Sequence, residues 1–396
     1  MIHELSIENF FSIADCQKVS FDVNEKAPDI PSYRTTNSFS SPVRTSAIIG
    51  FFGPNASGKS TVLRAISTVV RFLSSDPNFN GEFSQQFQPY KQKIWRNKPT
   101  KIRIAFDGQL AAGEPSCLFI YELHIDNSCE SGKKVVLHEA LFYLPNNKPR
   151  RLFKRDHQDI TFGKDFLISI KNMDKAVRDD ISIIDAMAML NHKPSMHISS
   201  LMSQIHMNES FGIPADIAHQ LMLFKYKNNP QCLADLNQEL VRFDMGLKSM
   251  QVQAVSGKLF AKFEHEGLDG YIDFNEESSG TQKFIAIFLK LHFALTYGSV
   301  VLIDELDVEF HPLILPELFR WFSDPVRNKY NAQLIFTAHN PTILDELEKE
   351  QLFLIQKEHR KPSSIYRISS IKGLRRAPSL QKKYLSGELG AIPYIG

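Results

Sequence analysis

Long apolar runs and paired cysteines are both lacking in this 396-residue chain. No stretch approaches the ~18 apolar residues that a membrane span needs. The opening MIHELSIENFF carries acids where a signal peptide has a basic segment followed by an apolar one. Cys16, Cys117, Cys129 and Cys232 lie far apart without a C-x-x-C pair, which argues against a disulfide scaffold and a zinc knuckle. We therefore expect a cytoplasmic protein with no membrane association.

Net charge is also nearly absent, because 46 Lys and Arg oppose 44 Asp and Glu. The balance hides a polarity, since residues 357–383 hold nine bases and one acid, whereas residues 1–356 hold 37 bases and 42 acids. Two shorter basic clusters, 91–103 and 148–155, contain no acid. Nucleic acid or an acidic partner surface would suit these segments, although a charge run is more often a solvated face.

A glycine-rich loop at 53–60 follows a buried strand at 47–52 and precedes an amphipathic helix. Its sequence, GPNASGKS, satisfies the phosphate-binding pattern G-x-x-x-x-G-K-[ST] in the context that gives this pattern meaning. Glycines let backbone N–H groups surround phosphate oxygens, the lysine adds a positive charge, and the serine hydroxyl can ligate Mg²⁺. The expected ATP-binding residues are Gly53, Pro54, Asn55, Ala56, Ser57, Gly58, Lys59, Ser60 and Thr61, with Ser60 also a metal ligand.

An apolar strand at 300–303 ends in two acids, Asp304 and Glu305. This is a Walker B pattern, in which Asp304 would hold Mg²⁺ through water and Glu305 would orient and deprotonate the attacking water. A strand that ends in a solvated acidic turn would be ordinary in isolation. The glycine-rich loop earlier in the chain favours the catalytic interpretation.

A third segment of small residues opens a helix shortly before Walker B. It resembles the signature loop of ABC ATPases, usually written L-S-G-G-Q, although Ser278 replaces the leucine and Thr281 the second glycine. In that family the loop caps the γ-phosphate bound by a second chain, so the resemblance implies a homodimer with ATP between its heads. A plain helix N-cap is the alternative. The residues implied to contact ATP are Ser278, Ser279, Gly280 and Gln282.

His339 follows a strand at 333–336 and resembles the switch histidine of ABC ATPases, which contacts the γ-phosphate and the attacking water. Asp307 matches the D-loop position. His311 and Pro312 complete a D-E-x-x-x-x-x-H-P pattern that looks like the RecF and OLD branch rather than transporters. The resemblance therefore implies Glu305 and His339 as the catalytic residues, with ATP and Mg²⁺ as cofactors.

The Q-loop glutamine, which contacts the metal in that family, is the least specific assignment. Gln88 is the choice because it precedes Pro89 and Tyr90. The alternatives are Gln85, Gln86 and Gln92.

The opening segment LSIENFFS, residues 5–12, looks like the first strand of RecF/SMC-type ATPases. The segments 139–142, 152–155 and 384–393 are similar to bacterial abortive-infection ATPases of the RloA type. The resemblance implies an α/β P-loop ATPase head of the ABC type, with an antiparallel β subdomain and an inserted helical lobe. Long coiled-coil arms are not expected, because no heptad pattern persists.

The motifs divide the chain into five expected parts. These are 1–73, the first half of the head with Walker A; 74–170, a β-rich subdomain with the Q-loop; 171–250, a helical lobe; 251–356, the second half of the head with signature, Walker B and switch histidine; and 357–396, a basic C-terminal segment.

Relatives of this kind usually act in anti-phage defence beside a nuclease or another toxic effector. We find no H-E-x-x-H, His-Asn-His or nucleophile motif in the chain, so we expect the effector to be a separate polypeptide. The expected function is an ATP-hydrolysing dimeric switch, with possible higher oligomers and nucleic-acid contact. One alternative is a RecF/SMC-like DNA repair ATPase, which would bind DNA in a salt-sensitive way. Another is an ATP-bound scaffold with low turnover.

Overall fold

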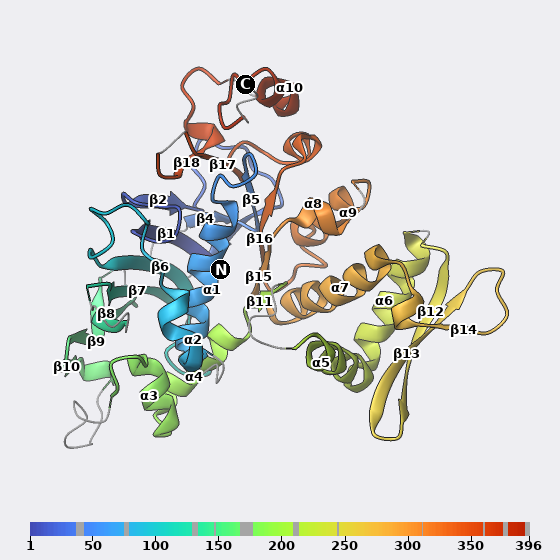
Figure 1. Cartoon of the computed structure of the whole chain (residues 1–396), viewed down its shortest axis with the longest axis horizontal. Coiled ribbons are helices and arrows are strands. Elements are labelled where there is room, and N and C mark those ends of the chain that lie inside the picture. Colours follow the sequence, from blue (N-terminus) through green and yellow to red (C-terminus); the bar gives the residue numbers. More distant parts are fainter. Residues whose placement is uncertain are drawn as a thin grey trace.

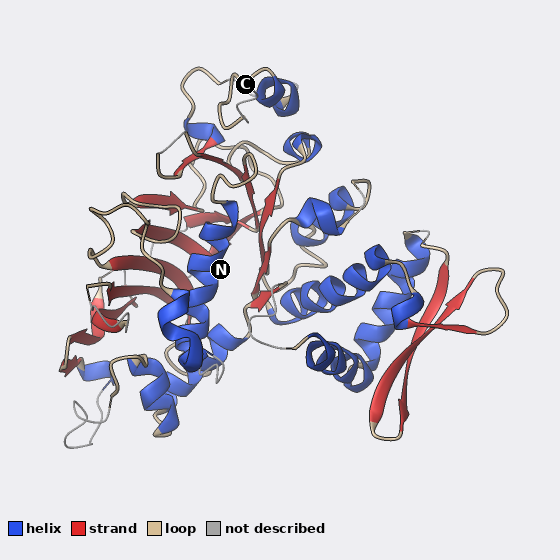
Figure 2. Cartoon of the chain, in the orientation of Figure 1, coloured by secondary structure: helices blue, strands red, loops and turns tan. Residues whose placement is uncertain are grey.

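A computed structural model gives the fold (Figures 1 and 2). It describes residues 1–36, 43–74, 79–128, 134–145, 148–166, 177–208, 214–243, 245–310, 312–358, 361–374 and 379–392. Two large sheets lie beside each other, and a smaller lobe of helices and strands extends from one of them. This confirms the expected α/β fold class.

A six-stranded sheet has the order β11-β15-β16-β5-β17-β18. Its strands are β5 (Ile48–Phe52), β11 (His206–Met207), β15 (Val300–Ile303), β16 (Gln333–Ala338), β17 (Leu352–Gln356) and β18 (Ser364–Arg367). All neighbours are parallel except β17 and β18. Every residue of β5, β15 and β16 is buried, as near-continuous apolar runs predict for parallel strands covered on both faces.

The two faces of this sheet belong to different hydrophobic cores. Ile49 and Phe51 of β5 pack in the core that contains α1 (Lys59–Leu73). Ile48 and Phe52 pack in the core of α7 (Ser279–Tyr297) and α9 (Leu315–Ser323). Side chains that alternate along β5 therefore pack against helices on both faces of the sheet. The loop after β5 lies at the end of the sheet where its parallel strands finish.

A seven-stranded antiparallel sheet has the order β10-β9-β8-β7-β6-β1-β2. Its strands are β1 (Ile2–Glu8), β2 (Gln17–Ser20), β6 (Thr100–Gly108), β7 (Cys117–Asp126), β8 (Val135–Leu144), β9 (Arg150–Asp156) and β10 (Asp159–Phe162). The expected β-rich subdomain is present, but the N-terminal strands join it because β1 pairs with β6. Helix α2 (Phe79–Gln86) lies between α1 and β6 in the chain.

The region expected as one helical lobe, 171–250, divides between two packing environments. Helices α3 (Ile183–Met189) and α4 (Lys193–Ser203) pack against α1. Helices α5 (Ala215–Asn228) and α6 (Pro230–Arg242) pack instead with α7 and the small sheet of β12 (Leu247–Val255), β13 (Lys258–His265) and β14 (Tyr271–Asp273). The division falls at β11, where His206 and Met207 pair with β15.

A further hairpin of β3 (Tyr33–Thr36) and β4 (Val43–Ser46) lies between β2 and β5 in the chain. Two further helices are short. Helix α8 (Leu306–Glu309) follows Walker B, and α10 (Leu380–Leu385) lies in the C-terminal segment. In the described part of the chain, no helix combines the length and the apolar character needed to cross a bilayer.

The described parts of the basic C-terminal segment fold against the head. Strand β18 pairs with β17, and the Tyr366 hydroxyl donates to the carbonyl of Leu389 at 2.8 Å. The N–H of Gln381 at the start of α10 donates to Asp345 at 3.0 Å, in the 3-10 helix Pro341–Asp345 that follows His339. This segment therefore contributes to the packed structure of the head.

A buried ion pair joins β8 and β9 of the antiparallel sheet, and its carboxylate also bonds the start of α3. Arg155 and Glu139 are both fully buried, with Nη1 of Arg155 3.9 Å from Oε2 of Glu139. The carboxylate also accepts from the Tyr121 hydroxyl at 3.0 Å and from the N–H of Ile183 at 3.1 Å. Burial nevertheless raises the pKa of Glu139 to about 7, because desolvation outweighs the attraction of Arg155.

We expect Glu139→Gln to remove a pH dependence of stability. Between the ordinary pKa of 4.5 and about 7, the folded chain keeps the Glu139 proton that the unfolded chain has released. Stability contributed by this group is therefore lost as the pH rises through that window. Urea unfolding from pH 4 to 8 should show the wild type losing stability relative to Glu139→Gln. The exposed change Glu114→Gln is the control, and parallel profiles for Glu139→Gln and wild type would contradict the assignment.

Candidate functional site

The phosphate-loop glycines lie where a side chain cannot fit. A Cβ on Gly53 would lie 2.2 Å from the carbonyl oxygen of Ile355 in β17. A Cβ on Gly58 would lie 2.4 Å from Oγ of Ser12 and 2.6 Å from Oγ of Ser363. Both glycines also have positive φ, 154° and 106°. The loop conformation therefore depends on close contacts with three distant segments.

The two serines also hold the loop by hydrogen bonds. The Ser363 hydroxyl donates to the carbonyl of Ser57 at 2.6 Å. The Ser12 hydroxyl lies 3.0 Å from the Thr61 hydroxyl in the first turn of α1. The loop is thereby fixed from the N-terminal turn on one side and from the C-terminal segment on the other.

Lys59 points back into its own loop. Its Nζ donates to the carbonyl oxygens of the first two loop residues, at 2.9 and 3.1 Å. Burial lowers the pKa of Lys59, and the nearby charges of Asp304, Asp307 and Glu305 oppose this effect. The structure therefore brings the Walker A lysine and the acids of the Walker B segment into one electrostatic environment.

Thr337, at the end of β16, organises the two Walker B acids. Its hydroxyl donates to Oδ1 of Asp304 and accepts from the N–H of Glu305 at 2.8 Å. Glu305 has a positive φ of 54°, which is uncommon for a residue other than glycine, and its side chain is exposed. The carboxylate of Glu305 is thus presented to solvent while its backbone is fixed from the neighbouring strand.

Asn208, which sequence reasoning missed, binds Asp304 from the other side. Its side-chain oxygen accepts from the N–H of Asp304 at 2.9 Å, and its amide donates to the carbonyl of Asp304 at 2.9 Å. Asn208, Ser60 and Asp304 line the same small cavity. Strand β11, which positions Asn208, has two residues and is too short to produce a periodic pattern. Only the strand order reveals this residue.

Gln88 lies near the loop through its backbone rather than its side chain. Its carbonyl accepts from the N–H of Phe11 at 2.8 Å, one residue before Ser12. Its side-chain amide donates to the carbonyls of Ser84 and Gln85, at 3.0 and 3.4 Å. The side chain of the expected Q-loop residue is therefore directed to its own segment.

His339 follows β16 directly and is held by Asp307. The backbone N–H of His339 donates to Oδ2 of Asp307 at 3.0 Å, and that of Asn340 donates to the same oxygen at 2.6 Å. Nε2 of His339 lies 4.0 Å from this oxygen, with 34% of the side chain exposed. Asp307, expected at the D-loop position, thus stabilises the loop that carries the switch histidine. His311 lies outside the described residues.

The signature-like segment lies on the separate lobe (Figure 1). Ser278 is the N-cap of α7 and accepts from the N–H of Thr281 at 3.1 Å. Gln282 donates to the carbonyls of Phe274 and Glu277, at 2.8 and 3.0 Å. Helix α7 has 19 residues, about 28 Å, and its far end leads into β15. The structure brings Walker A, Walker B and His339 together but holds the signature about one helix length away.

The donor atoms around the loop suit a nucleotide and a hard cation. Ser57 Oγ, Asp307 Oδ1 and His339 Nδ1 are buried polar atoms without a hydrogen-bond partner among the described residues. The cavity beside Ser60 and Asp304 offers hydroxyl, amide and carboxylate oxygens, which Mg²⁺ prefers. A magnesium ion bound with nucleotide phosphates needs only one or two protein ligands.

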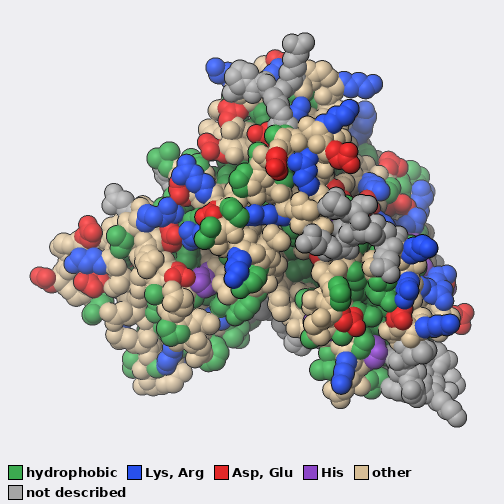
Figure 3. All heavy atoms as spheres, turned by 180° about the vertical axis from the view of Figure 1, so that it is seen from behind, with side chains coloured by type: hydrophobic (Ala, Val, Ile, Leu, Met, Phe, Trp, Pro, Cys, Tyr) green, Lys and Arg blue, Asp and Glu red, His purple; other side chains and the backbone are tan. Residues whose placement is uncertain are grey.

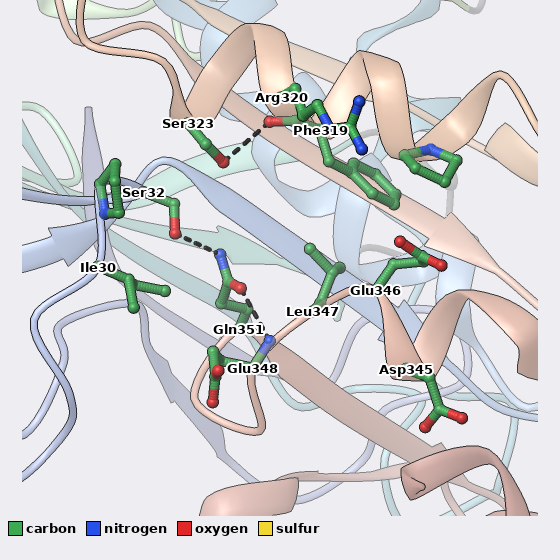
Figure 4. A pocket seen from close by; sticks show the side chains of 12 residues that line it. Ile30, Ser32, Phe319, Arg320, Ser323, Asp345, Glu346, Leu347, Glu348 and Gln351 are labelled. Carbon is green, nitrogen blue, oxygen red and sulfur yellow. Dashed lines mark hydrogen bonds between the residues drawn. The ribbon is translucent and has the colours of Figure 1, made fainter. Parts of the chain in front are cut away.

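A larger hollow of about 300 Å³ lies elsewhere, between α9 and the 3-10 helix after His339 (Figure 4). Three acids, Asp345, Glu346 and Glu348, lie among its lining residues. Gln351 crosses it, with its amide 3.2 Å from the Ser32 hydroxyl and its oxygen accepting from the N–H of Glu348 at 2.9 Å. Because the acids would repel phosphates, this hollow does not suit ATP.

The six-stranded α/β sheet with a phosphate-binding loop between β5 and α1 defines a P-loop nucleotide-binding fold. A family model described as "AAA domain, putative AbiEii toxin, Type IV TA system" matches residues 48–345. The match spans most of the sequence, and the chain belongs to this family. No curated protein matches the chain.

Solved SMC heads are similar in structure. An SMC head bound to the C-terminal winged-helix domain of ScpA has 13% identity and a TM-score of 0.53, covering 96% of this chain and 99% of that one. The SMC head domain of Thermotoga maritima has 13% identity, a TM-score of 0.39 and coverages of 92% and 98%. A head with an extended coiled coil, bound to a ScpA domain from Pyrococcus furiosus, has 11% identity, a TM-score of 0.47 and coverages of 98%. At this identity, the first similarity shows a shared fold.

We expect Thr337→Val to slow ATP turnover. The change removes the hydroxyl that bonds Asp304 and leaves the N–H of Glu305 without its acceptor. Loss of a hydrogen bond to a charged group costs about 1.5 kcal/mol or more, so the turnover number should fall about tenfold or further. Steady-state phosphate release measures this effect. Thr296→Val, which removes an exposed hydroxyl near the end of α7, is the matched control. Wild-type turnover in Thr337→Val would refute the assigned role.

Proposed function

We propose that the chain is an ATP-binding, slowly hydrolysing, homodimeric switch of a bacterial anti-phage, abortive-infection system, and that it controls a separate effector such as a nuclease. One observation carries this proposal. Walker A, Walker B and His339 follow the C-terminal ends of neighbouring parallel strands. The signature lies on another lobe, about one helix length away. A complete site then needs a second copy of the chain.

In this proposal the backbone N–H groups of residues 53–61 bind the phosphates, and Lys59 leaves the loop carbonyls to pair with them. Ser60 and Asp304 would hold Mg²⁺, which neutralises charge on the phosphate oxygens when bound. Asn208 lies in the same cavity and takes the place that the sequence suggested for Gln88. Glu305 accepts the proton of the attacking water, and His339 contacts the γ-phosphate.

The second chain would supply Ser278, Ser279, Gly280 and Gln282. Their backbone forms the N-terminal end of α7, whose unpaired N–H groups and positive dipole favour a phosphate. Ser278, Ser279 and Gly280 are exposed, so a phosphate on a partner chain can approach them. The N-cap role of Ser278 is compatible with this contact, because a cap shapes the same helix end.

The defence role is supported by the family description, which refers to the AbiEii toxin and a Type IV toxin–antitoxin system. Partner control is supported by the similar SMC head, whose structure contains a bound domain of another protein. That fold similarity also favours a second candidate, a RecF/SMC-like repair ATPase that acts on DNA directly. An ATP-bound scaffold with low turnover is the third, and measured hydrolysis distinguishes it from the others.

The composite site predicts complementation between two inactive variants. Lys59→Ala should weaken ATP binding about tenfold or more through loss of a charge-assisted contact, and Ser279→Arg should block the exposed signature. A mixed dimer contains one intact Walker site facing one intact signature. An equal mixture should therefore recover up to about a quarter of wild-type turnover.

The control is each variant measured alone at the same total concentration, which should stay inactive. Light scattering should also show ATP-dependent dimers for Glu305→Gln, which retains ATP by blocking hydrolysis. A Glu305→Gln chain that stays monomeric with ATP and Mg²⁺, or a mixture without recovered turnover, would contradict the shared site.

The switch role predicts a nucleotide-controlled partner in cells. Tagged wild type, Lys59→Ala and Glu305→Gln should be isolated from the native host with and without phage infection. A toxic or nuclease-like partner whose recovery differs between the two variants would support a defence switch. Recovery of DNA and replication proteins alone would support the repair candidate instead.

A further inference from the structure

The fold neutralises part of the charge in the described residues of two of the three basic segments, although Lys148, Arg151 and Lys372 stay exposed. In the C-terminal segment, Arg367 is largely buried, which lowers its pKa, and Lys383 pairs with Glu388 at 2.6 Å. In the segment 148–155, Arg155 is fully buried beside Glu139, and Lys154 pairs with Asp156 at 2.5 Å. Arg360, Arg375 and Arg376 lie outside the described residues. The high linear charge of these two segments is therefore a poor guide to free surface charge.

The first part of the third basic segment, residues 91–98, keeps its charge, whereas Lys101 and Arg103 pair with acids. The loop 91–98, between α2 and β6, exposes Lys91, Lys93 and Arg96 to solvent. The sequence contains no acid from 83 to 106, and no ion pair reaches these three cations in the described part of the chain. The loop lies at the side of the antiparallel sheet beside β1 and β2, along an edge lined by Lys and Arg side chains (Figure 1; Figure 3, right).

This loop is held in one conformation by a buried side chain. The Asn9 amide donates to the carbonyls of Trp95 and Lys98, at 2.9 and 2.7 Å. Its oxygen accepts from the N–H of Tyr90 at 2.9 Å. Asn127 donates to the same Lys98 carbonyl at 2.8 Å. Because these bonds already fix the backbone, a ligand would bind with little ordering cost.

The tip of the loop adds apolar surface among the cations. Ile94 is 68% exposed, so the loop presents an apolar side chain between its cations. Trp95 is half-buried, with the Lys98 ammonium 3.9 Å from its ring centre. Aromatic and apolar groups between cations suit a strand whose bases or sugars lie close to its phosphates.

We propose that the loop 91–98 binds the phosphodiester backbone of nucleic acid. Lys91, Lys93 and Arg96 contact successive phosphates, and Ile94 and Trp95 contact the adjoining sugars or bases. This inference goes beyond the ATP switch and does not rest on it, because none of these side chains belongs to the nucleotide site. An acidic protein surface is the competing ligand, and a measurement with polyglutamate distinguishes it from nucleic acid.

The test compares two triple charge reversals that change net charge equally. K91E/K93E/R96E alters the loop, and K193E/K227E/K258E alters exposed lysines on α4, α5 and β13. Fluorescence anisotropy would measure the binding of labelled duplex DNA, single-stranded DNA and single-stranded RNA between 50 and 200 mM salt. Because each lost phosphate contact removes nearly one unit of the salt slope, the loop variant should lose about two to three units and at least tenfold in affinity at 50 mM salt. The control variant should bind as the wild type does.

Several results would overturn the proposal. These are absence of salt-dependent binding by the wild type, an unchanged slope in the loop variant, an equal loss in the control, and equally tight binding of polyglutamate. The three labelled ligands distinguish DNA from RNA. Asn9→Gly gives a second measurement, because it permits the left-handed backbone at Asn9, φ 54°, while removing the anchoring side chain. It should weaken binding severalfold with all three cations intact. ATP turnover measured on the same proteins separates failure of this inference from failure of the switch.

Discussion

The close packing around Gly58 is the constraint on which the rest of the site depends. The absence of a side chain lets Ser12 and Ser363 approach the same backbone from opposite directions, although they are 351 residues apart in the chain. The N-terminal turn belongs to the antiparallel sheet and Ser363 precedes β18 of the parallel sheet. The phosphate loop is therefore also the point where the two sheets are joined, and a side chain at Gly58 would disturb both of them.

Motifs whose residues are close together in the sequence could be predicted from it. Contacts between residues that only the order of strands in the sheet brings together could not. Gly53–Ser60, the strand before it and α1 carry their signals within some 25 residues, and the structure confirms their positions. Thr337 and Asn208 carry no motif. Their importance arises because β16 and β11 flank β15, so that both side chains reach Asp304. Two residues of strand cannot be recognised by periodicity, and a parallel neighbour cannot be recognised without the sheet.

The signature illustrates why local geometry and function can point in different directions. Within one chain, Ser278 and Gln282 satisfy the start of α7, and each hydrogen bond that their side chains make among the described residues is local. A sequence reader would see a sufficient structural reason for both residues. In the proposed dimer, the exposed helix end and its separation from Walker A give a second reason for both residues. The departure of Ser278 and Thr281 from L-S-G-G-Q is then compatible with a helix end that binds phosphate through backbone groups.

Charge along a sequence differs from charge available at a surface, and this chain shows the physical reason. The segment 357–383 has the largest linear excess of bases, but its described part is folded through Arg367, β18 and α10, so burial and neighbouring acids reduce the free charge. The loop 91–98 has a smaller excess, yet its backbone is fixed by Asn9 and Lys91, Lys93 and Arg96 have no ion pair among the described residues. Asn9 and Ser12 belong to one turn, whose Phe11 is bonded to Gln88 and whose Ser12 contacts Thr61. The same turn thus supports the basic loop on one side and the phosphate loop on the other.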